Sequence, residues 1–291
     1  MIYQEYEVTT DERRGQSARV FFYIQAYTES IAVDKRPLVL ICPGGAYAYT
    51  SDREAEPIAL AFLAQGFHAA VLRYDCADYD ESAEETAGDA YEVEPAARIG
   101  VARAVALVYQ HAEEWHVDTS KIVLWGASAG GHLAAHYACT WYDEMPALTG
   151  LSRESLRIGG LMLAYPVITS GEKTHRDSIK NLLREKRNDP EERKRVSLEN
   201  RVNGHVPPTF LWHTWTDGSV PVENSLLFAQ ALKEHDVQTE LHIFPAGGHG
   251  LSLADERTVS SFSLEIEPCC QIWIDLACAW LKRLAGKAEA R

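Results

Sequence analysis

Short apolar runs alternate with helix-like segments along most of this chain, and this alternation limits the folds open to it. The run PLVLICPGG, residues 37–45, begins apolar throughout, as in a strand buried on both faces of a parallel sheet. Further strand-like runs lie at 18–28, 67–74, 121–125, 159–168, 208–217 and 239–250, and helix-like segments lie at 54–65, from Pro95 onward, at 222–235 and near 267–284. The alternation predicts an α/β fold, in which a mostly parallel, doubly wound sheet carries helices on both faces.

Loop lengths and charge runs bear on the domain organisation. No linker rich in Pro, Gly or Ser divides the chain, so residues 1–291 are predicted to form a single domain. Residues 170–205 are too long for a simple connection and are predicted to form a small cap-like insertion after the strand at 159–168. Two charged stretches, acidic at 75–94 and mixed in sign at 184–195, are explained most simply as solvated loop or exposed helix. Because both follow predicted strands, they are also placed to border a ligand crevice.

The charge balance and the cysteines restrict partners and location. With 28 Lys and Arg against 42 Asp and Glu, the net charge is −14, which disfavours nucleic acid and anionic membranes as partners. No apolar run approaches the roughly 18 residues that a membrane span needs. The first residues lack the apolar core of an export signal, and the six cysteines form no Cys-x-x-Cys pair. We therefore expect reduced thiols and a cytoplasmic location.

The pentapeptide Gly126-Ala127-Ser128-Ala129-Gly130 carries the strongest chemical signal. It follows the strand-like KIVLW and precedes the helix-like HLAAHYA, so the chain must turn sharply at Ser128. Such a turn exposes the serine hydroxyl, and small residues on either side let strand and helix approach each other. The pattern predicts that Ser128 is a nucleophile.

A serine hydroxyl needs a base, and the base needs an acid that orients it. His249 lies in PAGGHG just after an apolar strand, whereas the other ten histidines lie within elements or away from that strand end. Asp217 follows the preceding strand, 32 residues before His249, with Glu223 and Asp255 as rival carboxylates. An Asp-Gly pair also forms turns, which is compatible with a catalytic role. We predict His249 as the base and Asp217 as the acid.

Acyl transfer also requires backbone N–H donors for an oxyanion. One donor is expected from Ala129, the residue after the nucleophile. The loop Pro-Gly-Gly-Ala-Tyr after the strand at 37–42 should supply the others, because glycine leaves its N–H open to a ligand. We assign Gly45 and Ala46 to this role.

Cofactor and metal motifs are weak in this sequence. His132 and His136 have the i, i+4 spacing of a zinc helix, but Leu133 occupies the place of the glutamate in His-Glu-x-x-His. No P-loop and no Gly-x-Gly-x-x-Gly after the first strand is found. We predict neither a cofactor nor a metal.

Taken together, these motifs resemble the α/β-hydrolase superfamily. WGASAGGHLAAH, the PGGAY loop, TFLWHTWTDGSVPVENS and PAGGHG are similar to the esterase branch that includes bacterial acetyl xylan esterases and bifunctional feruloyl/acetyl xylan esterases, a branch related to the hormone-sensitive-lipase group. The likeness runs from about Pro37 to His249. It implies the α/β-hydrolase fold and a cofactor-free esterase, acting on acetylated sugars or xylo-oligosaccharides.

The resemblance also implies roles for single residues. It implies the triad Ser128, Asp217 and His249, with Gly45, Ala46 and Ala129 at the oxyanion positions. Pro43 stands where the His-Gly-Gly-Gly form has histidine, and Ala46 stands where it has its last glycine. This departure favours the xylan-esterase branch over the lipases proper.

Three functions are compatible with these residues. The first is a serine esterase that hydrolyses small, short-acyl esters through an acyl-enzyme intermediate. The second is a serine peptidase of the prolyl-oligopeptidase type, although about 36 residues before Pro37 cannot encode its propeller. The third is a binding protein that keeps the hydrolase scaffold without catalysis. A homo-oligomer paired through Trp273 and Trp280 of the last helix is a further expectation, and core packing explains these two residues equally well.

Overall fold

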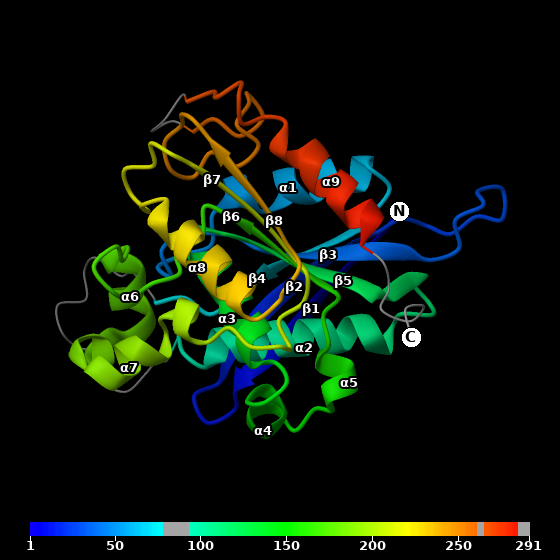
Figure 1. The fold of residues 1–291 in the computed structure, drawn as a ribbon. Coiled ribbons are helices and arrows are strands. Elements are labelled where there is room, and N and C mark those ends of the chain that lie inside the picture. The colour runs from blue at the N-terminus through cyan, green and yellow to red at the C-terminus, as the bar shows by residue number, and fades with distance from the viewer. Residues whose placement is uncertain (78–92, 261–264, 285–291) are drawn as a thin grey trace.

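The structure of this chain, a computed structural model, describes residues 1–77, 93–260 and 265–284. These residues form an eight-stranded sheet in the order β1-β2-β4-β3-β5-β6-β7-β8 (Figure 1). The strands from β4 to β8 in this order run parallel, and β1 and β2 are antiparallel to their neighbours. Their bounds are β1 Ile2–Asp11, β2 Gln16–Ile24, β3 Arg36–Cys42, β4 His68–Arg73, β5 Val117–Ala127, β6 Gly160–Ala164, β7 Thr209–Thr214 and β8 Thr239–Phe244.

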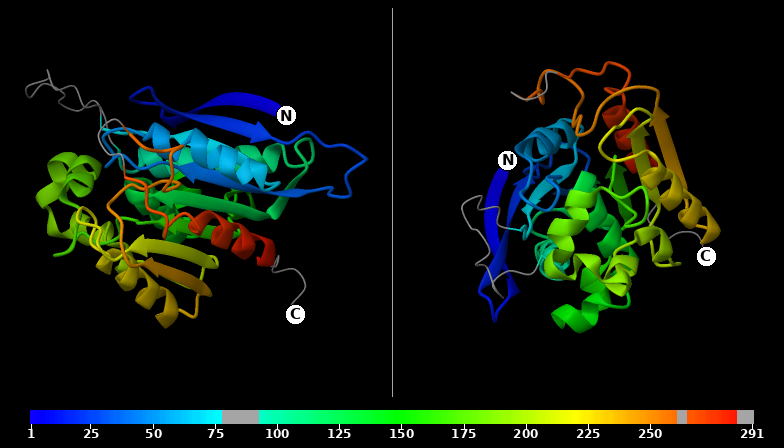
Figure 2. Two further views of the ribbon diagram at one scale, coloured as in Figure 1. Left: turned by 90° about the horizontal axis from the view of Figure 1, so that it is seen from above. Right: turned by 90° about the vertical axis from the view of Figure 1, so that its left-hand side faces the viewer.

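Helices cover both faces of the sheet, as the two views of Figure 2 show. Residues of α1 and α9 pack into one apolar layer, and residues of α2, α3 and α8 pack into the other. The helices are α1 Glu56–Ala64, α2 Ala96–Gln110, α3 Ser128–Thr140, α4 Met145–Thr149, α5 Arg153–Leu156, α6 Arg176–Leu183, α7 Pro190–Arg195, α8 Glu223–Glu234 and α9 Trp273–Arg283, with 3₁₀ turns η1 Asp52–Glu54, η2 Arg184–Asn188 and η3 Leu198–Asn200. The predicted doubly wound α/β fold is confirmed.

The apolar run of β3 explains why the sheet is buried on both faces. Side chains alternate along a strand, so Leu38 and Leu40 enter the layer formed by α2 and α3, whereas Val39 and Ile41 enter the layer of α1 and α9. All four are fully buried. A strand in this position cannot alternate polar and apolar residues, and its sequence does not.

The first strand, β1, was not predicted from the sequence. β1 pairs with β2 at the edge of the sheet, and its residues alternate between half-buried and exposed along most of its length. Glu5, Glu7 and Thr9 take three of the exposed positions, so the strand lacks the apolar run that marks β3. Its register with β2 comes from a turn and from tertiary pairing, which no short apolar pattern records.

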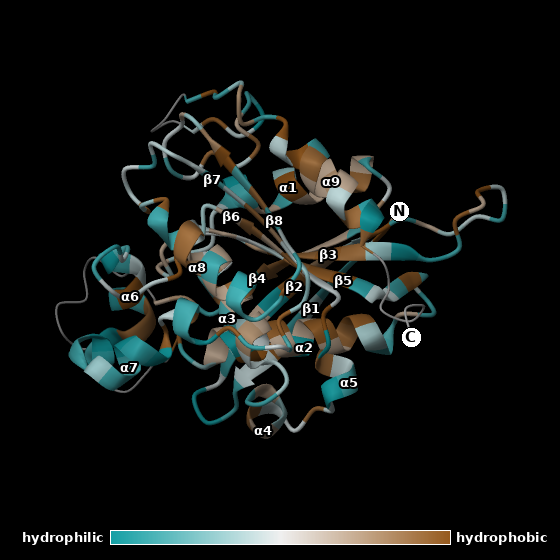
Figure 3. Ribbon diagram, in the orientation of Figure 1, coloured by the Kyte–Doolittle hydropathy of each residue, from teal (hydrophilic) through white to brown (hydrophobic). Residues whose placement is uncertain are grey.

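The segment 170–205, predicted to be a cap-like insertion, contains α6, η2, α7 and η3. It lies beside the sheet at the left of Figure 1, and α7 is strongly hydrophilic in Figure 3. The charged stretch within it is not purely solvated. Arg195 forms an ion pair with Glu94, at 3.0 Å between Nη1 and Oε1, and the Glu94 side chain is almost completely buried.

Glu94 is the last residue of the acidic stretch 75–94, of which residues 78–92 lie outside the described part of the chain. Burial opposes its ionisation, but Arg98 and Arg195 outweigh that effect and lower the pKa of the Glu94 carboxyl. Removing one partner of a buried ion pair strongly destabilises the folded protein, because the other charge is left buried and unpaired. The insertion is therefore anchored to α2 by charge as well as by packing.

The last helix does not present the aromatic surface that pairing of two copies would use. Trp273 is fully buried and Trp280 is nearly so, and both belong to the apolar layer to which α1 and α9 contribute. A homo-oligomer therefore remains a prediction without these residues as its basis. In the described part of the chain, no helix combines the length and the apolar character that crossing a membrane requires.

Candidate active site

The turn from β5 into α3 holds Ser128 in a conformation that ordinary residues avoid. Its φ is +52°, in the left-handed region, and the residue is only 6% exposed. A Cβ at Gly126 would lie 2.3 Å from the carbonyl oxygen of Gly130, and one at Gly130 would lie 2.0 Å from that of Cys42. Only glycine fits at either position, so the pentapeptide is required by close packing of β5, α3 and β3.

Three side chains form a continuous hydrogen-bonded chain above the carboxyl ends of the strands. Ser128 Oγ lies 2.8 Å from His249 Nε2, and His249 Nδ1 lies 2.7 Å from Asp217 Oδ2. Ser128 follows β5, Asp217 follows β7 and His249 follows β8, all from the same edge of the sheet. The three residues singled out by the sequence thus meet in the order nucleophile, base and acid.

Asp217 is held as a carboxylate by its surroundings. Its Oδ1 accepts the backbone N–H groups of Ser219 and Val220, each at 2.9 Å. Burial disfavours the charged form, but hydrogen bonds from His213 and His249 outweigh burial and hold the pKa of Asp217 well below its usual range. An ionised Asp217 can accept the Nδ1–H of His249 and so fix the tautomer whose Nε2 faces Ser128.

The rival carboxylates lie in other interactions. Glu223 forms an ion pair with Lys173, at 2.8 Å between oxygen and nitrogen. Asp255 forms a bidentate pair with Arg257 two residues later. Nδ1 of His249 is instead hydrogen-bonded to Asp217.

The glycine-containing loop after β3 packs directly against the nucleophile. A Cβ at Gly44 would lie 3.0 Å from the Cβ of Ser128. Gly45 has φ +125° and Ala46 has φ +55°, conformations that turn the backbone sharply at this point. Ala129 is the second residue of α3, where helical N–H groups have no intrahelical acceptor. The loop that contains Gly45 and Ala46 and the first turn of α3, which contains Ala129, therefore both adjoin Ser128.

Glu54 is a residue of this site that the sequence did not single out. Its side chain is buried; Oε2 accepts the N–H of Gly44 at 2.8 Å, and Oε1 accepts the hydroxyl of Tyr165 at 2.7 Å. The Tyr165 oxygen in turn accepts the N–H of Ser252, three residues after His249, and its ring contacts the His249 ring edge-on at 5.2 Å. One carboxylate thus links the loop after β3 to the segment that carries the histidine.

The insertion also reaches the site. Asn181 of α6 donates to the carbonyl oxygen of Ala46 at 2.9 Å. His175, which precedes α6, lies with its ring 6.3 Å from that of His249 and nearly parallel to it. Sequence position had set His175 apart from the catalytic strand ends, so this placement corrects that expectation. Burial, followed by the nearby His249, lowers the pKa of His175, which favours its neutral form.

His132, one of the two histidines with zinc-like spacing on α3, has a packing role in this structure. His132 Nδ1 lies 2.8 Å from the hydroxyl of Tyr47, and its Nε2 lies 2.8 Å from the carbonyl oxygen of Val196. Both ring nitrogens are thus engaged, and burial lowers the pKa of His132 to about 4. Among the described residues, no three His, Cys, Asp or Glu side chains are arranged to hold a metal ion.

Comparison of the sequence with those of known proteins identifies a family and several relatives. The sequence profile of the BD-FAE family matches residues 24–232. The endo-1,4-beta-xylanase B of Butyrivibrio fibrisolvens is 34% identical over 262 residues, which cover 90% of this chain but only 39% of that protein. The chain therefore spans about two fifths of the length of this curated relative.

Two solved structures are similar over nearly the whole chain. The carboxylesterase Cest-2923 from Lactobacillus plantarum is 29% identical, with a TM-score of 0.82 and coverage of 99% of this chain and 100% of that one. The acetyl ester-xyloside bifunctional hydrolase from Caldicellulosiruptor lactoaceticus is 35% identical, with a TM-score of 0.73 and coverage of 94% and 90%. These similarities confirm the resemblance to esterases of the α/β-hydrolase superfamily.

Proposed function

The chain belongs to the BD-FAE family, and we propose that it is a serine carboxylic ester hydrolase with Ser128 as its nucleophile. The observation that carries this proposal is the chain of hydrogen bonds from Ser128 through His249 to Asp217, at 2.8 and 2.7 Å. Similar proteins named as carboxylesterases support the same class of enzyme.

In the proposed reaction His249 Nε2 accepts the hydroxyl proton of Ser128 while Oγ attacks the ester carbonyl carbon. The carbonyl oxygen becomes an oxyanion and receives the N–H groups of Gly45, Ala46 and Ala129. As the tetrahedral intermediate collapses, the alkoxy oxygen leaves with the proton that His249 returns to it. Water, deprotonated by the same imidazole, then attacks the acyl-enzyme and releases the carboxylic acid and the free serine.

Glu54 has a positioning role in this scheme. By accepting the N–H of Gly44, it holds the backbone of the loop in one orientation, so that the next two N–H groups point toward the oxyanion. Its second oxygen fixes Tyr165, which packs edge-on against His249. Pre-set donors of this kind accelerate the reaction because they need no reorganisation when charge develops.

We propose short acyl esters of sugars, including acetylated xylo-oligosaccharides, as the substrates. The similar bifunctional hydrolase that is named for acetyl ester and xyloside substrates supports this choice. The insertion supports the short acyl group, because η2 and α7 bury no residue and the apolar side of α6 is already packed. A lid that opens on lipid would instead carry an apolar face toward the interface.

Labelling with a fluorophosphonate tests the nucleophile. The wild-type protein should gain one adduct on the peptide that contains Ser128, and Ser128→Ala should gain none while its circular dichroism is unchanged. Turnover of acetyl, butyryl, feruloyl and peptide substrates by the wild-type protein then tests the substrate class. An unlabelled wild-type protein would favour the non-catalytic alternative, and faster cleavage of peptides than of esters would favour the peptidase.

A further inference from the structure

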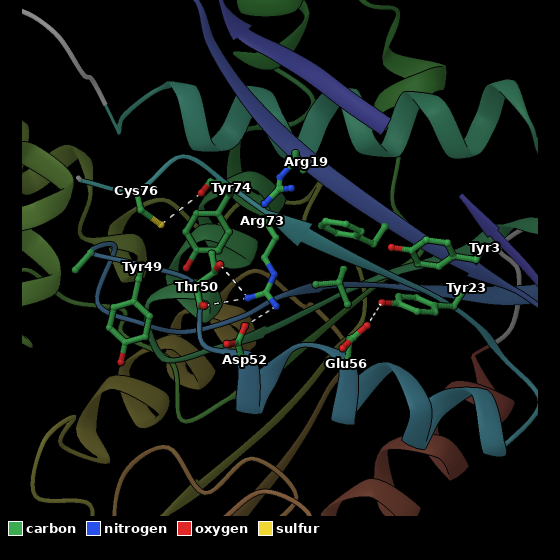
Figure 4. A pocket seen from close by; sticks show the side chains of 13 residues that line it. Tyr3, Arg19, Tyr23, Tyr49, Thr50, Asp52, Glu56, Arg73, Tyr74 and Cys76 are labelled. Atoms are coloured by element: carbon green, nitrogen blue, oxygen red, sulfur yellow. Dashed lines mark hydrogen bonds and ion pairs between the residues drawn. The ribbon is translucent and has the colours of Figure 1, made fainter. Parts of the chain in front are cut away.

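A second hollow lies outside the site described above, on the sheet face beside α1. It has a volume of about 650 Å³ and is lined by residues of β1, β2, β4, α1 and the segment 48–52. In Figure 4, Tyr49 and Thr50 mark one end of this hollow, Tyr3 and Tyr23 mark the other, and Arg73 lies between them. We call it the outer groove. Its size falls within the range of roughly 300–1,000 Å³ that is usual for small-molecule sites.

Aromatic rings are open to solvent at both ends of the outer groove. Tyr49 is 63% exposed at the end nearest the loop after β3, and Tyr3 is 54% exposed at the far end. Tyr3 also packs against Tyr23 with ring centroids 5.4 Å apart, which fixes its ring on the sheet surface. Tyrosine offers a ligand a flat apolar face with a hydrogen-bonding hydroxyl at its edge. A sugar ring has the complementary form, with C–H groups on its faces and hydroxyls around its rim.

The charges of the outer groove balance, which selects for a neutral ligand. Among the described residues that line it, the two cations Arg19 and Arg73 match the two carboxylates Asp52 and Glu56. Arg73 pairs with Asp52 at 2.7 Å, and Glu56 accepts the hydroxyl of Tyr23 at 2.6 Å. Such a surface has donors and acceptors for hydroxyl groups, and its described lining carries no excess charge of either sign to attract a phosphate or a polyelectrolyte.

The outer groove adjoins the loop of the active site. The N–H groups of Ala48 and Tyr49 donate to the carbonyl oxygen of Gly45, at 2.9 and 3.3 Å. Arg73 secures the next residue by donating to the carbonyl oxygen of Thr50 at 3.0 Å. A ligand that occupies the outer groove therefore ends one turn of backbone away from the proposed oxyanion donors.

We propose that the outer groove binds the neutral backbone of an acylated oligosaccharide or polysaccharide whose acyl group reaches Ser128. This inference rests on the proposed esterase function and adds a second binding surface to it. Tyr3 and Tyr49 stack on sugar rings at the two ends, and the polar side chains between them bind hydroxyl groups. Chain length then raises affinity, because rings beyond the esterified one make contacts of their own.

Binding of oligosaccharides without ester groups tests the outer groove separately from catalysis. Deacetylated xylo-oligosaccharides, from xylobiose to xylohexaose, are titrated into Ser128→Ala by NMR, and then into Ser128→Ala with Tyr3→Ala added. We expect affinity to rise with chain length, and Tyr3→Ala to weaken binding of the longest chain about three- to tenfold, as for loss of one aromatic contact. Tyr27→Ala is the matched control, because Tyr27 is similarly exposed and does not line the outer groove.

Kinetics on esters complete the test in the otherwise wild-type protein. The ratio of kcat/KM for acetylated xylohexaose to that for p-nitrophenyl acetate should fall in Tyr3→Ala and Tyr49→Ala, and stay constant in Tyr27→Ala. If both esters were turned over, but neither the titration nor the kinetics depended on the chain length of the sugar, the proposed role of the outer groove would be wrong and the proposed esterase function would stand. Absence of all ester turnover would instead refute the proposed function, while the titration still decides the groove. If Tyr3→Ala changes the molecular mass measured by light scattering but leaves sugar binding unchanged, this surface joins copies of the chain and the proposal is wrong.

Discussion

Replacing Asp217 by asparagine turns one carboxylate oxygen into an NH₂ group, and the surrounding hydrogen bonds decide which one. Oδ1 accepts the N–H groups of Ser219 and Val220, each at 2.9 Å. These donors require an oxygen, so the NH₂ of the asparagine must take the place of Oδ2, which faces Nδ1 of His249 at 2.7 Å. The substitution is therefore predicted to keep the local backbone and to reverse the polarity of the hydrogen bond with His249. It also removes the acceptor that Oδ2 offers to His213 Nε2 at 3.3 Å, and His213 keeps the carbonyl oxygen of Val220 as its other partner, at 3.0 Å.

This reversal places the imidazole proton on the wrong nitrogen. An NH₂ group donates, so Nδ1 of His249 must accept, and the proton moves to Nε2. That nitrogen lies 2.8 Å from Ser128 Oγ and can then no longer accept the serine proton. A wrong tautomer of this type costs up to about 10⁴ in kcat in serine hydrolases, so we expect a loss of about 10³ to 10⁴. This corresponds to roughly 4–5.5 kcal/mol of activation free energy.

The assay is kcat and KM for p-nitrophenyl acetate at neutral pH, with near-ultraviolet circular dichroism to verify the fold. Glu223→Gln and Asp255→Asn are matched controls, because each also converts a rival carboxylate into an amide. Both should keep turnover close to wild type, since their partners are Lys173 and Arg257. Nearly full activity in Asp217→Asn, combined with a large loss in either control, would refute the assignment of the acid.

Three further predictions follow from other contacts. Glu54→Ala should lower kcat about ten- to a hundredfold at similar KM, because the N–H of Gly44 loses its acceptor. Glu54→Gln should recover most of the loss, because its amide oxygen can accept that N–H. Equal losses of kcat in both variants would argue against the positioning role. Acetyl esters should give a higher kcat/KM than octanoyl esters, and activation at an oil–water interface would contradict the packed, hydrophilic insertion. Burial lowers the pKa of His68 and of His132 to about 4, so each resists protonation more in the folded than in the unfolded chain. The stability that the two neutral histidines contribute is complete above pH of about 6.5 and is lost as pH falls toward 4, by about 3 kcal/mol each. Urea denaturation at pH 7 and at acidic pH would measure this loss. If His132→Gln lost as much stability between these pH values as the wild-type protein, the explanation would be refuted.

The parts of the site that could be predicted from the sequence are those whose causes are local. The turn at Ser128 needs glycine two residues before and after it, because the carbonyl groups of Gly130 and Cys42 leave no room for a Cβ. A pentapeptide records that requirement directly. His249 and Asp217 follow two neighbouring parallel strands, β8 and β7, and parallel strands deliver the residues that follow them to one edge of the sheet.

The contacts that escaped prediction join residues far apart in the chain. Glu54 and Tyr165 are 111 positions apart, and nothing near either residue indicates the other. In the sequence, Glu54 looks like any acidic residue at the start of a helix, a position where carboxylates are common for reasons unrelated to catalysis. His175 lies in the segment 170–205, far in sequence from the strand that precedes His249, and only the path of this segment brings its ring beside that of His249.

The loop after β3 is held from three directions, which gives the insertion a part in the site beyond covering it. Glu54 binds the N–H of Gly44 from the side of the sheet, and Asn181 of the insertion binds the carbonyl oxygen of Ala46. His132 joins the hydroxyl of Tyr47 to the carbonyl oxygen of Val196, again within the insertion. A loop whose residues carry positive φ at several positions would otherwise relax, since such conformations persist only when their surroundings fix them. The charged residues that anchor the insertion through Glu94 and Arg195 thus support the proposed oxyanion donors at a distance, and loosening that anchor should lower kcat before it changes KM.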